Sequence, residues 1–280
     1  MIVDFHAHTF PDRIAAAAVD KLKQASRTRP FTDGTAGQLK ASMARAGVDR
    51  TVVLPVGTNP LKITSVNDAS LRANEAGEGL IYFAAIHPDA PNWHEELGRV
   101  AAAGLQGVKL HPVYQGVDLD DPRYLRILAR AGELGLIVVT HAGDDIGYPG
   151  AVRCSPEMIV GALRQVGPVR FVAAHMGGWR NWDRAVDLLA GTDVYIDTAF
   201  SLGRLTPLTP DAYTETELQM LTEAQFCKIV RAFGSKRVLF GSDSPWADQA
   251  ADVAQLRALP LTEAEKDDIL GGNARRLLKL

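Results

Sequence analysis

Short apolar runs alternate along the chain with longer stretches in which apolar residues recur at helical spacing. Several short runs, such as 136–139, are apolar throughout, which is typical of parallel strands buried on both faces. The sequence predicts eight strands, at 2–6, 50–56, 80–86, 107–110, 136–140, 170–174, 194–198 and 237–241. Helices are expected at 13–25, 35–46, 62–76, 93–103, 122–134, 156–165, 182–189, 223–232, 247–258 and 262–270.

Eight strand–helix repeats predict a closed (β/α)8 TIM barrel, formed as a single domain by residues 1–280 with extra helices at its C-terminal end. The alternative is an open, doubly wound sheet. No glycine-rich nucleotide fingerprint follows any of the predicted strands, so the barrel is favoured. The connection 200–222 is unusually long, and in a barrel it would lie over the catalytic face.

Composition narrows the class of protein. The chain is 46% hydrophobic and 22% charged, which is ordinary for a globular domain. Its net charge of −3 and the absence of basic runs argue against a nucleic-acid partner. Apolar runs fall short of the ~20 residues of a membrane span, and no signal-peptide pattern opens the chain. Two cysteines are too few for a disulfide framework, so we expect a cytoplasmic enzyme.

Histidines concentrate where predicted strands end. Five of the seven lie at such positions, the C-terminal rim where barrel enzymes build active sites. His6 and His8 are two residues apart, so an extended strand places both on one face, where they can bind one metal ion. The full set of polar strand-end candidates is His6, His8, Lys109, His111, His141, His175 and Asp243.

Each strand-end histidine alone is a weak signal, because such residues often only form hydrogen bonds at the rim. Several protonated imidazoles at one rim would repel each other, whereas a metal requires them to be neutral. The set therefore predicts a divalent metal site. Asp4 precedes His6 by two residues and either orients an imidazole or forms a structural hydrogen bond deeper in the barrel.

The strand-end motifs resemble those of the amidohydrolase superfamily, most closely the amidohydrolase-related branch that includes aminocarboxymuconate-semialdehyde decarboxylase. The resemblance covers essentially the whole chain, and it implies a distorted barrel of the metallo-dependent hydrolase type that binds one or two divalent metals, often zinc. The motifs are VDFHAH at 3–8, GVKLHP at 107–112, THAG at 140–143, AHMGG at 174–178, FGSDSP at 240–245 and ILGGNARRLL at 269–278.

By this resemblance, His6, His8 and His141 correspond to metal ligands. Asp243 corresponds to a further ligand or to a group hydrogen-bonded to the metal-bound water. His175 corresponds to a ligand of a second metal or, in the decarboxylase-like branch, to a catalytic residue beside a single metal.

Lys109 is open to two interpretations. In binuclear relatives a lysine here can be carbamylated and bridge two metals, whereas in this branch an unmodified ammonium facing a substrate carboxylate is favoured. His111 lies on the same strand face and is expected as a second substrate contact. Trp246 follows Asp243 closely and either forms a wall of the substrate pocket or packs in the core.

Of the one or two divalent ions that the resemblance implies, one per chain is favoured over two, with zinc first and manganese as the alternative. The first functional hypothesis is hydrolysis of a small, carboxylate-bearing amide, lactone or ester by a metal-activated water, with Asp243 and His175 moving protons. The second is non-oxidative decarboxylation of a small unsaturated or aromatic acid. A non-catalytic scaffold is disfavoured because the full ligand set is present. Both enzymes would bind a small anionic substrate, and a homo-oligomer is compatible with either.

Overall fold

The computed structural model describes all 280 residues. Its parallel strands form two sheets that together make a barrel. The first sheet holds β1 (Val3–Ala7), β2 (Arg50–Val53) and β3 (Leu80–Tyr82). The second holds, in order, β4 (Ala84–Ala85), β5 (Gly107–Leu110), β6 (Ile137–Thr140), β7 (Arg170–Ala173), β8 (Tyr195–Asp197) and β9 (Val238–Leu239).

The two sheets are joined at both edges. β3 and β4 are parts of one predicted strand, 80–86, which is interrupted at Phe83. On the opposite side, the N–H of Phe5 donates to the carbonyl of Phe240 at 2.7 Å, and Ala7 forms a parallel bridge with Ser244. These contacts close β1 against β9, which confirms the predicted eight-stranded barrel.

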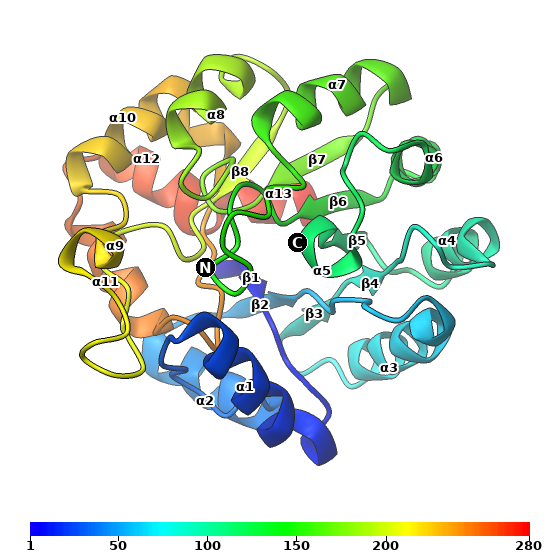
Figure 1. Cartoon of the computed structure of the whole chain (residues 1–280), viewed down its shortest axis with the longest axis horizontal. Helices are drawn as coiled ribbons and strands as arrows, with labels where there is room; N and C mark the ends of the chain where they lie inside the picture. The colour runs from blue at the N-terminus through cyan, green and yellow to red at the C-terminus, as the bar shows by residue number, and fades with distance from the viewer.

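Helices form an outer ring around the strands (Figure 1). Most of the predicted helices are present within two residues of their expected ends. The short helices α5 (Pro112–Gln115) and α9 (Glu215–Leu218) were not predicted, because one helical turn leaves too little periodic pattern. The others are α1 (Asp12–Ser26), α2 (Ala36–Ala46), α3 (Ile63–Glu75), α4 (Trp93–Ala102), α6 (Pro122–Glu133), α7 (Pro156–Val166), α8 (Trp182–Leu189), α10 (Glu223–Phe233), α11 (Gln249–Ala258), α12 (Glu263–Asp267) and α13 (Asn273–Leu278), with 3-10 turns at Pro60–Lys62 and Ser235–Arg237.

The predicted helix 262–270 is not continuous. It consists of α12, which opens with the capping box of Thr262 and Glu265, followed by the π-helical turn Asp268–Gly272. None of the helices combines the length and apolarity that crossing a membrane requires.

The N-terminal half of the barrel interior is an apolar core. Inward-facing side chains such as Phe5 and Phe83 fill it, and Leu277 and Leu278 of α13 close it from below. Figure 1 shows α13, in red, lying across the far end of the strands. This packing occupies one end of the barrel, so polar chemistry is left to the C-terminal end of the strands.

β1 changes register against β2 between Asp4 and Ala7. As a result, Asp4 and His6 do not share a face, contrary to the expectation from strict strand alternation. The Asp4 carboxylate accepts hydrogen bonds from the hydroxyl of Ser242 (2.6 Å) and the amide of Gln249 in α11 (2.7 Å). Of the two roles left open for Asp4, the structural one is therefore correct.

The long connection 200–222 packs beside the C-terminal rim, as predicted. It contains α9, and its backbone pairs with the segment after α1 through an antiparallel bridge between Thr28 and Pro207. The indole of Trp179, four residues after His175, donates to the carbonyl of Phe200 at 3.0 Å. The connection is thereby tied to the residues that follow β7.

Candidate metal centre

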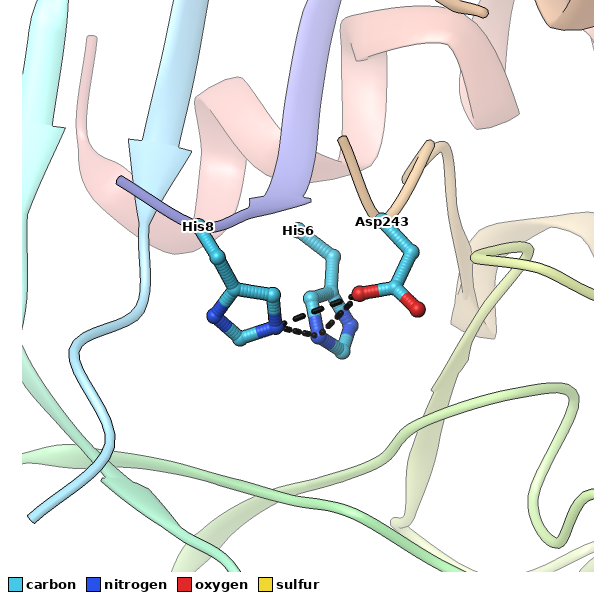
Figure 2. A group of neighbouring side chains, drawn as sticks. All are labelled: His6, His8 and Asp243. Atoms are coloured by element: carbon cyan, nitrogen blue, oxygen red, sulfur yellow. Dashed lines mark hydrogen bonds and ion pairs between the residues drawn. The ribbon is translucent and has the colours of Figure 1, made fainter. Parts of the chain in front are cut away.

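Three of the predicted ligands converge at the C-terminal rim. The Nε2 atoms of His6 and His8 are 3.2 Å apart. The Oδ1 atom of Asp243 lies 3.5 Å from Nε2 of His6 and 3.2 Å from Nε2 of His8. Figure 2 shows the ring of His6 at the end of β1, the ring of His8 just after that strand and the carboxylate from the loop after β9 pointing toward one another.

The outer nitrogens of both imidazoles are held by acceptors. Nδ1 of His6 lies 2.8 Å from Oδ2 of Asp197, and Nδ1 of His8 lies 2.7 Å from the carbonyl of Leu54. A carbonyl or carboxylate oxygen can only accept, so each neutral ring carries its proton on Nδ1. Both Nε2 lone pairs therefore face the space beside Asp243, in the arrangement that ligating histidines usually show.

The donor set fits a divalent cation. Two nitrogen lone pairs and one carboxylate oxygen repel each other unless a positive charge lies between them. Ligand atoms about 2.0–2.1 Å from a tetrahedral ion lie about 3.3 Å from each other. The three distances among His6, His8 and Asp243, from 3.2 to 3.5 Å, match that value.

Asp243 is held in an unusual backbone conformation. Its φ is 67°, in the left-handed region that residues with a side chain rarely adopt, and its N–H donates to the carbonyl of His6 at 2.7 Å. Burial alone would raise the pKa of Asp243. Contacts with His8, His6 and His175 outweigh burial and hold this pKa well below its usual range, so the carboxylate is ionised.

Lys109 reaches the same atoms from β5. Its ammonium nitrogen is 3.1 Å from Nε2 of His6, and the side chain is buried. Burial lowers the pKa of Lys109 to about 8, against the opposing effect of the carboxylates Asp197 and Asp243. The lysine that sequence reasoning assigned to the substrate thus lies beside the first predicted metal ligand.

His141 lies in a neighbouring group, beside His175. Nδ1 of His141 is 3.0 Å from Nε2 of His175, while their outer nitrogens face the carbonyls of Asp144 and Ala199 at 3.0 and 2.9 Å. Burial lowers the pKa of each ring to about 4. Two neutral rings in this arrangement point lone pairs at each other, so the pair requires a proton or a cation between them.

His111 is placed at the edge of this group. Its ring stacks on Tyr114 and His141, with centroid separations of 3.8 and 4.5 Å. Its Nε2 is 3.6 Å from the carboxylate of Asp145, and its Nδ1 is buried without a partner. His175, like Asp243, has a left-handed backbone, with φ of 61°.

Trp246 lies three residues after Asp243, and its backbone N–H donates to the Asp243 carbonyl at 2.9 Å. It lines a cavity between α11 and the loops after β8 and β9, and none of the four predicted metal ligands lines that cavity.

Sequence reasoning missed Asp197 and Asp145. Asp197 is the last residue of β8 and is fully buried. The position at a strand end that indicated Asp243 would therefore have indicated Asp197 as well. Asp145 lies in the loop after β6, four residues beyond His141, and no periodic pattern singles it out.

Comparison with protein families supplies the deciding observation. Residues 3–280 match the amidohydrolase family. The chain belongs to the amidohydrolase family. The match covers almost the whole chain and confirms the family inferred from the strand-end motifs. A search of curated proteins finds no match to this sequence.

Solved structures share the fold at low sequence identity. An uncharacterized TIM-barrel protein of Bordetella bronchiseptica is 19% identical, with a TM-score of 0.72 over 99% of this chain and 98% of that one. A Pseudomonas putida protein proposed to be a 2-pyrone-4,6-dicarboxylic acid hydrolase is 21% identical, with a TM-score of 0.66 over 99% and 97%. A 5-carboxyvanillate decarboxylase mutant of Novosphingobium aromaticivorans, bound to manganese and 3-methoxy-4-hydroxy-5-nitrobenzoic acid, is 14% identical, with a TM-score of 0.69 over 100% and 97%. These barrels include a proposed hydrolase and a decarboxylase, so they support the fold and leave the reaction open.

Proposed function

We propose that this amidohydrolase is a metal-dependent hydrolase of a small, carboxylate-bearing lactone, ester or amide, with the single barrel domain of residues 1–280 as the catalytic unit. The observation that carries the proposal is the convergence of two unprotonated imidazole nitrogens and an ionised carboxylate at the barrel rim. His6, His8 and Asp243 would hold one divalent ion, zinc first and manganese as the alternative. His141 is the proposed fourth ligand.

A divalent ion bound there would lower the pKa of a water molecule and polarise a substrate carbonyl. Asp243, which is ionised, accepts the proton of the attacking water as the new carbon–oxygen bond forms. The same proton then passes to the leaving oxygen or nitrogen as its bond to carbon breaks. His175 lies beside His141 in the same rim, and with a proton on its Nε2 atom its ring would stabilise the developing negative charge on the carbonyl oxygen.

Lys109 and His111 are proposed to bind the substrate. Both are buried on the inner side of β5 and its end, and an ammonium group there pairs with a substrate carboxylate. The bound anion would in turn keep Lys109 protonated at neutral pH.

Non-oxidative decarboxylation is the second candidate, favoured by the buried Lys109 beside the proposed ligands. In this reaction the bond between a ring or chain carbon and the carboxylate breaks and carbon dioxide leaves. A proton that His175 or Asp243 takes up from water then replaces it on carbon. The Novosphingobium decarboxylase binds manganese and a nitrobenzoate, which supports a similar ligand class here.

The test is metal analysis followed by two product assays. We expect about one equivalent of zinc or manganese after dialysis against both ions, and base-consuming hydrolysis of small carboxylated lactones, followed at constant pH. The Asp243→Asn variant should lose that activity. Carbon dioxide release from aromatic acids without hydrolysis would select the decarboxylase. A chain that binds no metal and turns over neither class would overturn both proposals.

A further inference from the structure

A cavity of about 210 Å³ lies between the barrel wall and α11, and none of the proposed metal ligands lines it. The ends of β8 and β9 form its floor, α10 and α11 flank it, and the loops after β8 and β9 close it. Figure 1 shows these two helices at the same side of the barrel. Its lining includes the aromatic residues Phe31, Phe200 and Trp246, together with Asp252 of α11.

The carboxyl group of Asp252 lines this cavity and has no interaction partner in the protein. No hydrogen bond or ion pair of the structure involves its carboxyl group, whereas the neighbouring Asp248 caps α11 by accepting from the N–H of Ala250 at 3.1 Å. Burial raises the pKa of Asp252 well above its usual range, and the nearby carboxylates Asp4 and Asp248 raise it further. The protein places no positive charge beside this carboxyl group, and a cationic ligand could supply one.

Arg204 is the one cationic residue in the lining, and it does not neutralise Asp252. Its guanidinium lies 2.9 Å from the carboxylate of Glu215, and its side chain is 51% exposed. Arg204 therefore lies at the mouth of the cavity, already paired.

We propose that this cavity binds a small organic ammonium ion, with Asp252 as its counterion and the rings of Trp246 and Phe200 as its walls. Aromatic rings attract a cation through their negative faces, and the attraction grows when water is excluded. Phe31, which is 40% exposed, is a further aromatic residue of the lining. An organic cation fits this lining better than a metal ion, because most of the walls are carbon. Of the two lining carboxyl groups, that of Asp248 caps α11 and only that of Asp252 has no partner.

An occupant would touch two loops that also hold the metal centre. The N–H of Trp246 donates to the carbonyl of Asp243 at 2.9 Å. Phe200 follows Ala199, whose carbonyl accepts from His175. The ligand would therefore stabilise the backbone on which Asp243 and His175 depend, and this site is distinct from the substrate site of the proposed function.

Benzylamine is the probe, with benzyl alcohol as a neutral control of similar shape. We expect benzylamine to raise the melting temperature of the full chain in a concentration-dependent manner and to change its tryptophan fluorescence, while benzyl alcohol does neither. The Asp252→Asn variant should bind benzylamine at least about tenfold more weakly, since it loses a charge-assisted hydrogen bond. Ala251→Leu, which fills the cavity from α11, should have the same effect.

The exposed Asp183→Asn of α8 is the matched control and should bind as the wild type does. The melting temperature of each variant without ligand establishes that it is folded. Unchanged benzylamine binding in a folded Asp252→Asn would overturn the proposal, as would absence of binding to the wild type at millimolar concentration. Equal or preferred binding of benzyl alcohol would show that the cavity selects an apolar ring rather than a positive charge, and it would also overturn the proposal.

Discussion

Replacing Asp197 with asparagine should weaken metal binding by moving a proton on His6. The two carboxylate oxygens of Asp197 have different partners. Oδ1 accepts from the backbone N–H groups of His175 and Ala199 at 2.9 and 3.2 Å, and Oδ2 faces Nδ1 of His6 at 2.8 Å. Asparagine has one acceptor oxygen, and the two backbone donors will keep it. Its NH2 group will then face Nδ1 of His6.

An amide donor opposite Nδ1 stabilises the tautomer of His6 that carries its proton on Nε2. That nitrogen is the one facing His8 and Asp243, so the proton must leave before an ion can bind. Loss of a partner that orients a ligating histidine costs about 10–100-fold in metal affinity. This corresponds to about 1.4–2.7 kcal/mol. The fold should survive, because the variant has the same shape and keeps both backbone hydrogen bonds.

The assay is competition for zinc between the protein and a chromophoric chelator at neutral pH. Wild type, Asp197→Asn and the exposed control Asp183→Asn of α8 are compared, with melting temperatures measured on the metal-free proteins. The control should have the wild-type dissociation constant. An unchanged constant in Asp197→Asn, alongside loss of metal in His6→Ala, would refute the tautomer argument and leave His6 as a ligand.

In the same assay, His6→Ala should lower the affinity for zinc by more than 100-fold. Asp243→Asn should instead retain most of its bound metal and lose turnover. If His6→Ala and the wild type held equal amounts of metal, the ion would have to bind elsewhere. Because burial lowers the pKa of Lys109 to about 8, its ammonium is lost as the pH rises through that value, and the KM for an anionic substrate should rise about tenfold per unit above it. Lys109→Met should have a high KM at every pH, and a wild-type KM that is flat up to pH 10 would contradict the role of the ammonium. Asp4→Ala leaves several buried donors, including the Ser242 hydroxyl, without an acceptor and should lower the free energy of unfolding by about 3–5 kcal/mol in urea titrations. As a control, Asp20→Ala at an exposed position should change the free energy of unfolding by less than about 0.5 kcal/mol. A similarly small change for Asp4→Ala would show that water replaces the hydrogen bonds of Asp4.

The sequence alone was sufficient to predict the barrel and the end of it that carries the chemistry. Local patterns decide both, because the alternation of buried strands with amphipathic helices selects the fold, and parallel strands bring all their C-terminal ends to one rim. His6, His8 and Asp243 could therefore be expected together although 235 residues separate the second from the third.

Only the tertiary structure decided which side chains face each other. The register shift in β1 turns Asp4 out toward α11 and His6 in toward Asp197, and strict alternation in the sequence hides such a shift. The partner of each imidazole comes from a strand far away in the chain, as Asp197 is 191 residues from His6. Hydrogen bonds of this kind fix the tautomer and the direction of a ring, and they depend on the exact closure of the barrel rather than on any local pattern.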